Sequence, residues 1–111
     1  RDALSDAFRR LGQGGVDALV ARLSDEKAAV REHAAEALGY VGGPEADGAA
    51  EALAKATADD DAEVRLAAVS ALGQLGYASD DALKAVAEGD DTGLAAIARR
   101  FLAERETGEQ A

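Results

Sequence analysis

The stretch that decides the fold is DEKAAVREHAAEALGYVG at residues 25–42, which returns 34 residues later as DDDAEVRLAAVSALGQLG at residues 59–76. The two copies agree at the positions of Asp25, Val30, Arg31, Ala34, Ala37, Leu38, Gly39 and Gly42. Internal repeats of about 20–50 residues indicate units that bury their apolar faces by stacking on one another. The sequence therefore predicts a stacked repeat architecture.

Apolar and small residues within each copy are spaced as on one face of an α-helix. Val30, Ala34 and Leu38 follow one another at intervals of four residues, which is typical of an amphipathic helix. Gly42 and Gly76 follow these runs, where a glycine in the left-handed conformation commonly ends a helix. Helices are predicted at residues 2–12, 15–23, 26–41, 46–57, 61–76, 80–87 and 92–106.

Weaker copies of the unit lie on both sides. A shift of 30 residues carries Leu72 to Leu102, and a shift of 27 in the other direction carries Leu38 to Leu11. We expect one domain, residues 1–106, followed by a frayed tail at 107–111. Its predicted parts are a half repeat at 1–14 and full repeats at 15–43, 44–77 and 78–106.

The stretches 25–42 and 59–76 resemble the HEAT-like repeats named after the phycobilisome lyases. In that family an Asp is followed, after a short gap, by Val-Arg, Ala-Ala, Ala-Leu-Gly and a closing pair of an apolar residue and Gly. The resemblance covers about residues 15–105. It implies an all-α fold, an α-solenoid (α-α superhelix) of about three helical hairpins plus one leading helix.

The resemblance also implies a structural ladder of Asp and Arg side chains that runs from unit to unit. Its expected members are Asp25, Arg31, Asp59 and Arg65. The corresponding positions of the third unit are Gly89 and Ala95, so the ladder is expected to end there.

Three arginines of the last predicted helix, Arg99, Arg100 and Arg105, fall where the earlier units carry other residue types. They predict a charged outer face, such as a capping repeat presents to water. We therefore expect the stack to end near residue 106, and the front to be cut or covered by a partner.

Composition narrows the possible partners. Twelve basic and 22 acidic residues give a net charge of −10, which repels polyanions, so neither nucleic acid nor an anionic membrane surface is expected to bind.

The absence of Cys excludes thiolate metal sites and disulfides, and we expect a cytoplasmic protein. An acid-rich, Lys-poor, Ala-rich chain is typical of halophilic archaea, with an ordinary acidic domain of a high-GC bacterium as the alternative.

Catalytic and cofactor sites are not expected. His33, beside Glu32, is the only histidine, and one such pair cannot complete an iron site. The carboxylate pairs near residues 59–61, 80–81 and 90–91 lack the alternating ligands of a Ca²⁺ loop and suit helix capping. We predict no enzyme activity, no metal and no cofactor.

Protein binding remains, and the second helices of the hairpins are expected to line the concave face. The predicted partner-binding residues are Glu32, Glu36, Tyr40, Leu66, Ser70, Gln74 and Arg100. We expect a non-catalytic scaffolding module whose partner has a basic or mixed-charge surface. A dimer through the leading helix is a second way to cover the front edge. The alternative function is an accessory or regulatory domain of an enzyme such as a phycobilin-lyase-like protein.

The net charge predicts that salt stabilises the fold. Screening becomes strong as the Debye length falls from about 30 Å at 0.01 M salt to about 3 Å at 1 M, which relieves repulsion among the carboxylates. Thermal melts followed by circular dichroism should shift to higher temperature between low and molar KCl. An unchanged or lower melting temperature would contradict the halophilic interpretation.

Overall fold

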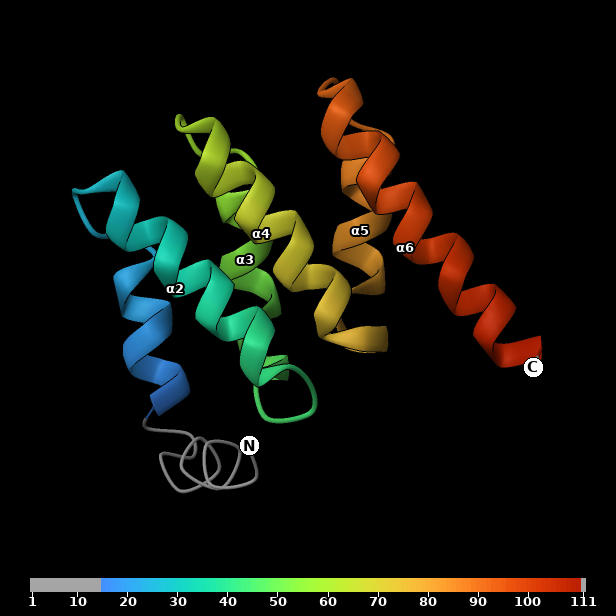
Figure 1. The fold of residues 1–111 in the computed structure, drawn as a ribbon, viewed down its shortest axis with the longest axis horizontal. Helices are drawn as coiled ribbons and strands as arrows, with labels where there is room; N and C mark the ends of the chain where they lie inside the picture. Colours follow the sequence, from blue (N-terminus) through green and yellow to red (C-terminus); the bar gives the residue numbers. More distant parts are fainter. Residues whose placement is uncertain (1–14, 111) are drawn as a thin grey trace.

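The computed structural model describes residues 15–110, and in this range the chain is helical throughout, apart from short turns (Figure 1). The first helical segment covers residues 15–22. The elements that follow are α2 (Ala28–Val41), the 3₁₀ turn η1 (Asp47–Ala49), α3 (Ala50–Ala56), α4 (Ala62–Gln74), η2 (Gly76–Ser79), α5 (Asp80–Ala87) and α6 (Thr92–Gln110). The all-α prediction is confirmed.

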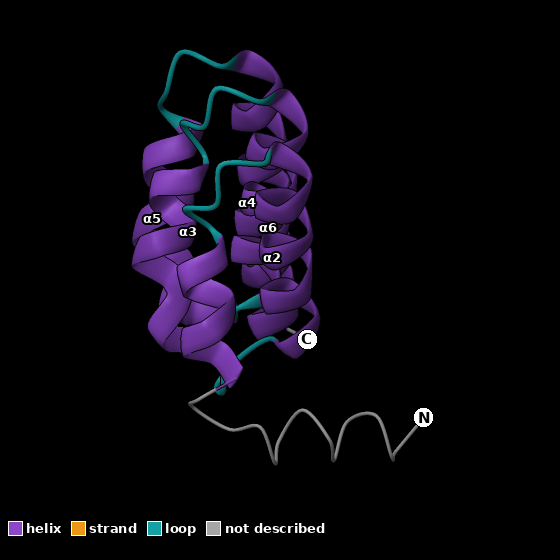
Figure 2. Ribbon diagram, turned by 90° about the vertical axis from the view of Figure 1, so that its left-hand side faces the viewer, coloured by secondary structure: helices purple, strands orange, loops and turns teal. Residues whose placement is uncertain are grey.

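Consecutive helices alternate between two layers (Figure 2). Helices α2, α4 and α6 form one layer, and α3 and α5 lie in the other. Within the first layer α2 packs on α4 and α4 on α6, and α3 contacts α5 in the second. Each hairpin therefore stacks on the next, as a solenoid requires. The predicted leading helix, the half repeat 1–14 and the dimer through it lie outside the described residues.

The core runs through the stack without a break. Leu38 of α2 and Leu72 of α4, which correspond under the repeat, are both fully buried, as are Leu53 of α3 and Leu83 of α5. Leu102 of α6 is only partly buried against the same cluster, because α6 has a neighbour within its layer on one side only. Burial of these leucines in successive hairpins is the main stabilising contribution to the stack.

Repeat-equivalent glycines let the helices of the first layer approach closely. A Cβ atom built on Gly39 would lie 2.9 Å from Cα of Ala71, and one built on Gly73 would lie 2.4 Å from the ring of Phe101. The expected glycine ends are confirmed by the positive φ angles of Gly42 (70°) and Gly76 (75°). In each of the first two units, glycine is therefore required once for packing and once for the turn.

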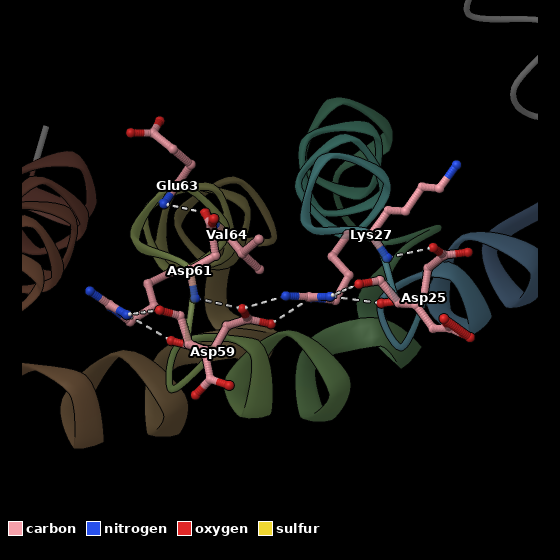
Figure 3. Close-up of polar contacts among 10 residues, drawn as sticks. Asp25, Lys27, Asp59, Asp61, Glu63 and Val64 are labelled. Atoms are coloured by element: carbon pink, nitrogen blue, oxygen red, sulfur yellow. Dashed lines mark hydrogen bonds and ion pairs between the residues drawn. The ribbon is translucent and has the colours of Figure 1, made fainter.

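Arg31 ties the first hairpin to the second. Its Nε and Nη2 atoms donate to the carboxylate oxygens of Asp59 at 2.9 and 3.0 Å (Figure 3). Its Nη1 donates to the backbone carbonyls of Asp25 and Glu26 at 2.8 and 3.1 Å. Such two-pronged guanidinium–carboxylate contacts constrain orientation as well as distance, so this arginine fixes how the two hairpins are set against each other.

Arg65 repeats the arrangement one unit later. Its Nη1 donates to the carbonyls of Asp59 and Asp60 at 2.7 and 3.1 Å, and its Nε lies 3.6 Å from Oδ2 of Asp91. The expectation that the ladder loses its acid in the third unit is therefore wrong. The 30-residue offset aligns Asp91 with Asp61, the residue that caps α4. Asp91 also accepts from the backbone N–H of Leu94, so it combines capping with pairing.

The last helix departs from the prediction in two ways. It continues to Gln110, so the tail predicted at 107–111 is wrong for residues 107–110, where no proline interrupts the helix, while residue 111 lies outside the described range. Arg105 does not face outward. It donates to the Gly73 carbonyl at 3.3 Å and pairs with Asp80, because its long side chain reaches across to the turn between α4 and α5. Arg100, by contrast, is 83% exposed.

Replacing Gly39 by Ala tests the close approach of α2 and α4. Alanine favours a helix over glycine by up to about 1 kcal/mol, but forcing an extra methyl group into this contact costs about 1–3 kcal/mol. We expect urea denaturation to show a net loss of stability. Gly93→Ala is the matched control, because a Cβ there meets only a carboxylate oxygen of Asp91 at 3.5 Å. Equal effects of the two substitutions would contradict the packing role.

Asp59→Asn tests the ladder. Hydrogen bonds from Arg31 hold the pKa of the Asp59 carboxyl below its ordinary value, so this group contributes stability above the carboxyl's unfolded pKa. That contribution is lost as pH falls through the lowered pKa. At neutral pH, Asp59→Asn should lower the denaturation midpoint more than Asp60→Asn, which removes an exposed carboxylate. The difference should disappear in acid; a difference that persists there would contradict the assignment.

Candidate functional site: the groove between α2 and α4

An open groove of about 550 Å³ lies between α2 and α4 on the outer side of their layer. It is lined from α2 by Glu32, Glu36, Gly39 and Tyr40, and from α4 by Glu63, Leu66, Ala67, Ser70, Ala71 and Gln74. We call this surface the α2–α4 groove.

Helical spacing explains why these side chains converge. On α2 the residues Glu32, Glu36 and Tyr40 lie four apart, and so do Leu66, Ser70 and Gln74 on α4. Residues four apart lie on the same face of a helix. The two helices are the second members of consecutive hairpins, so they run in the same direction. Each of these residues on α2 therefore has a counterpart on α4, and we call each such pair across the groove a row. The rows Glu32/Leu66, Glu36/Ser70 and Tyr40/Gln74 span about 12 Å along the helix axes.

Small residues form the floor of the groove. Gly39 approaches Ala71 closely, and Ala67 and Ala71 are buried between the helices. The longer side chains of the rows rise on either side. The same glycine that permits close stacking therefore gives the groove its depth.

The charges that line the groove have one sign. Glu32, Glu36 and Glu63 are its charged lining residues, and no ion pair within residues 15–110 includes any of them. Two other grooves are lined by a basic residue, which is Arg22 in one and Arg65 in the other. The groove is thus a negative surface whose carboxylates repel one another.

The groove also carries exposed apolar surface. Tyr40 is 70% exposed and Leu66 42% exposed, and they are the large hydrophobic residues exposed in the described part of the chain. Both line the groove. Leu66 lies in the first row and Tyr40 in the last, so apolar surface is exposed at both ends of the groove, as is typical of surfaces that contact other molecules.

Six of the seven residues predicted to bind a partner line this groove, and Arg100 does not. Arg100 lies on α6 and pairs with Glu104 at 3.8 Å. The prediction missed Glu63, Gly39, Ala67 and Ala71. Glu63 precedes Leu66 by three residues, so helical spacing would have placed it on the same face. Its equivalent in α2 is Ala29. Because alanine is small and apolar, a comparison of equivalent positions in the repeats did not point to this position as a binding residue.

Three further observations concern metal ligands, the histidine and helix hydrophobicity in the described residues. Between positions 15 and 110, no group of three or more His, Cys, Asp or Glu side chains gathers where it could hold a metal ion. His33 is exposed and lines a different groove, with Leu19 and Arg22. None of the helices described is long and apolar enough to cross a bilayer.

Comparison with known proteins agrees with this geometry. The family model for HEAT repeats matches residues 16–103, which is the range of the stacked hairpins. No curated protein matches the sequence. Because the family model covers most of the chain and the observed hairpins account for the match, this protein belongs to the HEAT-repeat family.

Proposed function

We propose that this HEAT-repeat domain is a non-catalytic scaffolding module that binds a partner protein in the α2–α4 groove. The observation that carries the proposal is that Tyr40 and Leu66, both exposed, lie in the same groove. HEAT repeats commonly mediate protein–protein interactions. The family match over residues 16–103 therefore favours protein binding as the function of this domain.

The shape of the groove supports a protein as the ligand. It is open along its length between two helices, whereas small-molecule sites enclose most of the ligand surface. Tyrosine is enriched among the residues that dominate binding energy at protein interfaces. Burying Tyr40 and Leu66 against a partner would remove apolar surface from water, at about 25 cal/mol per Å².

The chemistry of the lining also supports binding over catalysis. Ser70 is the hydroxyl on α4 that lines the groove, and the residues around it are Glu, Gln, Tyr and small side chains. A serine nucleophile needs an adjacent base that is itself held by a third group. His33 does not line this groove, so no such arrangement includes it.

A role as an accessory or regulatory domain of an enzyme is compatible with this surface, since such a domain also acts by binding. The phycobilin-lyase version of that role stays a prediction. No feature of the groove specifically favours a tetrapyrrole over a polypeptide.

Site-specific cross-linking tests the proposal. A photoreactive residue at Ser70 should capture a discrete protein in extracts of the source cells, whereas one at Glu51, which is exposed on α3 in the other layer, should not. Combining Leu66→Glu with Tyr40→Ala should reduce capture at least about 30-fold, since truncating one dominant interface residue costs about 2 kcal/mol or more. Circular dichroism should be unchanged, because both side chains are exposed. Equal capture by the double variant would contradict the proposal.

A further inference from the structure

We infer that the α2–α4 groove recognises an unfolded, basic segment of its partner, and that the subsite at Leu66 takes one lysine or arginine side chain. The inference rests on the proposed function, because it names the chemistry of the partner at the same groove. It is argued from where the apolar and charged lining residues lie relative to one another.

Leu66 lies among the three carboxylates of the groove. Glu32 is its counterpart in the same row on α2, Glu36 lies one turn further along α2, and Glu63 lies one turn before Leu66 on α4. Side chains three or four residues apart on one helix have Cβ atoms about 5–6 Å apart, so Glu63 is a close neighbour of Leu66 on α4, while Glu32 and Glu36 line the opposite wall of the groove. The subsite therefore has an apolar centre and an acidic rim.

A lysine or arginine side chain matches this arrangement in both of its parts. Its hydrocarbon stem packs on apolar surface while its charged head stays at the polar edge. Over Leu66, the stem would cover the aliphatic side chain and the head would reach the surrounding carboxylates. An aliphatic residue would leave the carboxylates without a counter-charge, and an acidic residue would be repelled.

The carboxylates themselves favour a cation from outside the chain. Asp59 and Asp91 of the ladder are paired with Arg31 and Arg65. The carboxylates around Leu66 have no ion-pair partner in the described range. A cation from the partner would relieve their mutual repulsion, and complementary charge also speeds association.

The length of the groove limits how the segment binds. Tyr40 lies eight residues beyond Glu32 on α2, about 12 Å along the axis, a distance that an extended chain covers in about four residues. The end of the groove at Tyr40 and Gln74 carries no charge. We therefore place the basic residue over Leu66 and an apolar or aromatic residue three or four positions away, against Tyr40.

Selection from a random 12-residue peptide library displayed on phage tests this inference with the purified protein. Enriched peptides should contain a Lys or Arg and an apolar residue three or four positions apart. Their affinity, measured by fluorescence anisotropy, should fall at least tenfold for Glu32→Lys combined with Glu36→Lys. It should change less than twofold for Glu51→Lys combined with Glu88→Lys, which alters the net charge equally at exposed positions outside the groove.

A charge exchange completes the test. Replacing the basic residue of a selected peptide by Glu should abolish binding to the unmodified protein and restore binding to the Glu32→Lys, Glu36→Lys variant. Groove-dependent peptides without a basic residue would overturn the inference and leave the proposed function standing. So would a failure to select any peptide while cross-linking from Ser70 still captures a protein, because the partner would then be recognised as a folded surface. Failure of both experiments would overturn the proposed function itself.

Discussion

The close approach of α2 and α4 is the constraint on which the rest of the structure depends. It exists because Gly39 presents no side chain to Ala71. Bringing the two backbones together buries the leucines of both hairpins and leaves a floor of small residues between them. The apolar stacking and the groove are therefore two results of one contact, and a larger side chain at Gly39 would alter both.

Charged contacts fix how consecutive hairpins are positioned relative to one another in this apolar stack. Arg31 and Arg65 each bind backbone carbonyls of the turn before their own helix and a carboxylate of the following hairpin. Asp59 and Asp91 at the turns are paired in this way, whereas the three glutamates along the α2–α4 groove have no ion-pair partner in the described residues. In a chain with a net charge of −10, the groove is distinctive because its carboxylates share one surface with the exposed side chains of Tyr40 and Leu66.

Much of the fold was predictable, because the repeated residues include those that form the core, such as Ala34 and Leu38 of α2. The spacing of Val30, Ala34 and Leu38 determined which face of α2 points inward, and therefore which residues point outward into the groove. Long charged side chains were harder to place. Arg105 reaches a turn distant in sequence. Asp91 pairs with Arg65 in the ladder, although it aligns with the capping residue Asp61 and not with the ladder residue Asp59. Periodicity specifies the face of a helix but not the partner that a flexible side chain finds.

The most direct test of the central contact is a nuclear Overhauser measurement on the isotope-labelled protein in solution. A strong cross-peak between the Hα protons of Gly39 and the methyl group of Ala71 is predicted, because the outer face of Gly39 lies directly against that residue. If the Gly39 Hα protons showed cross-peaks only to their own helix, α2 and α4 would not be stacked, and the account of both fold and groove would be contradicted.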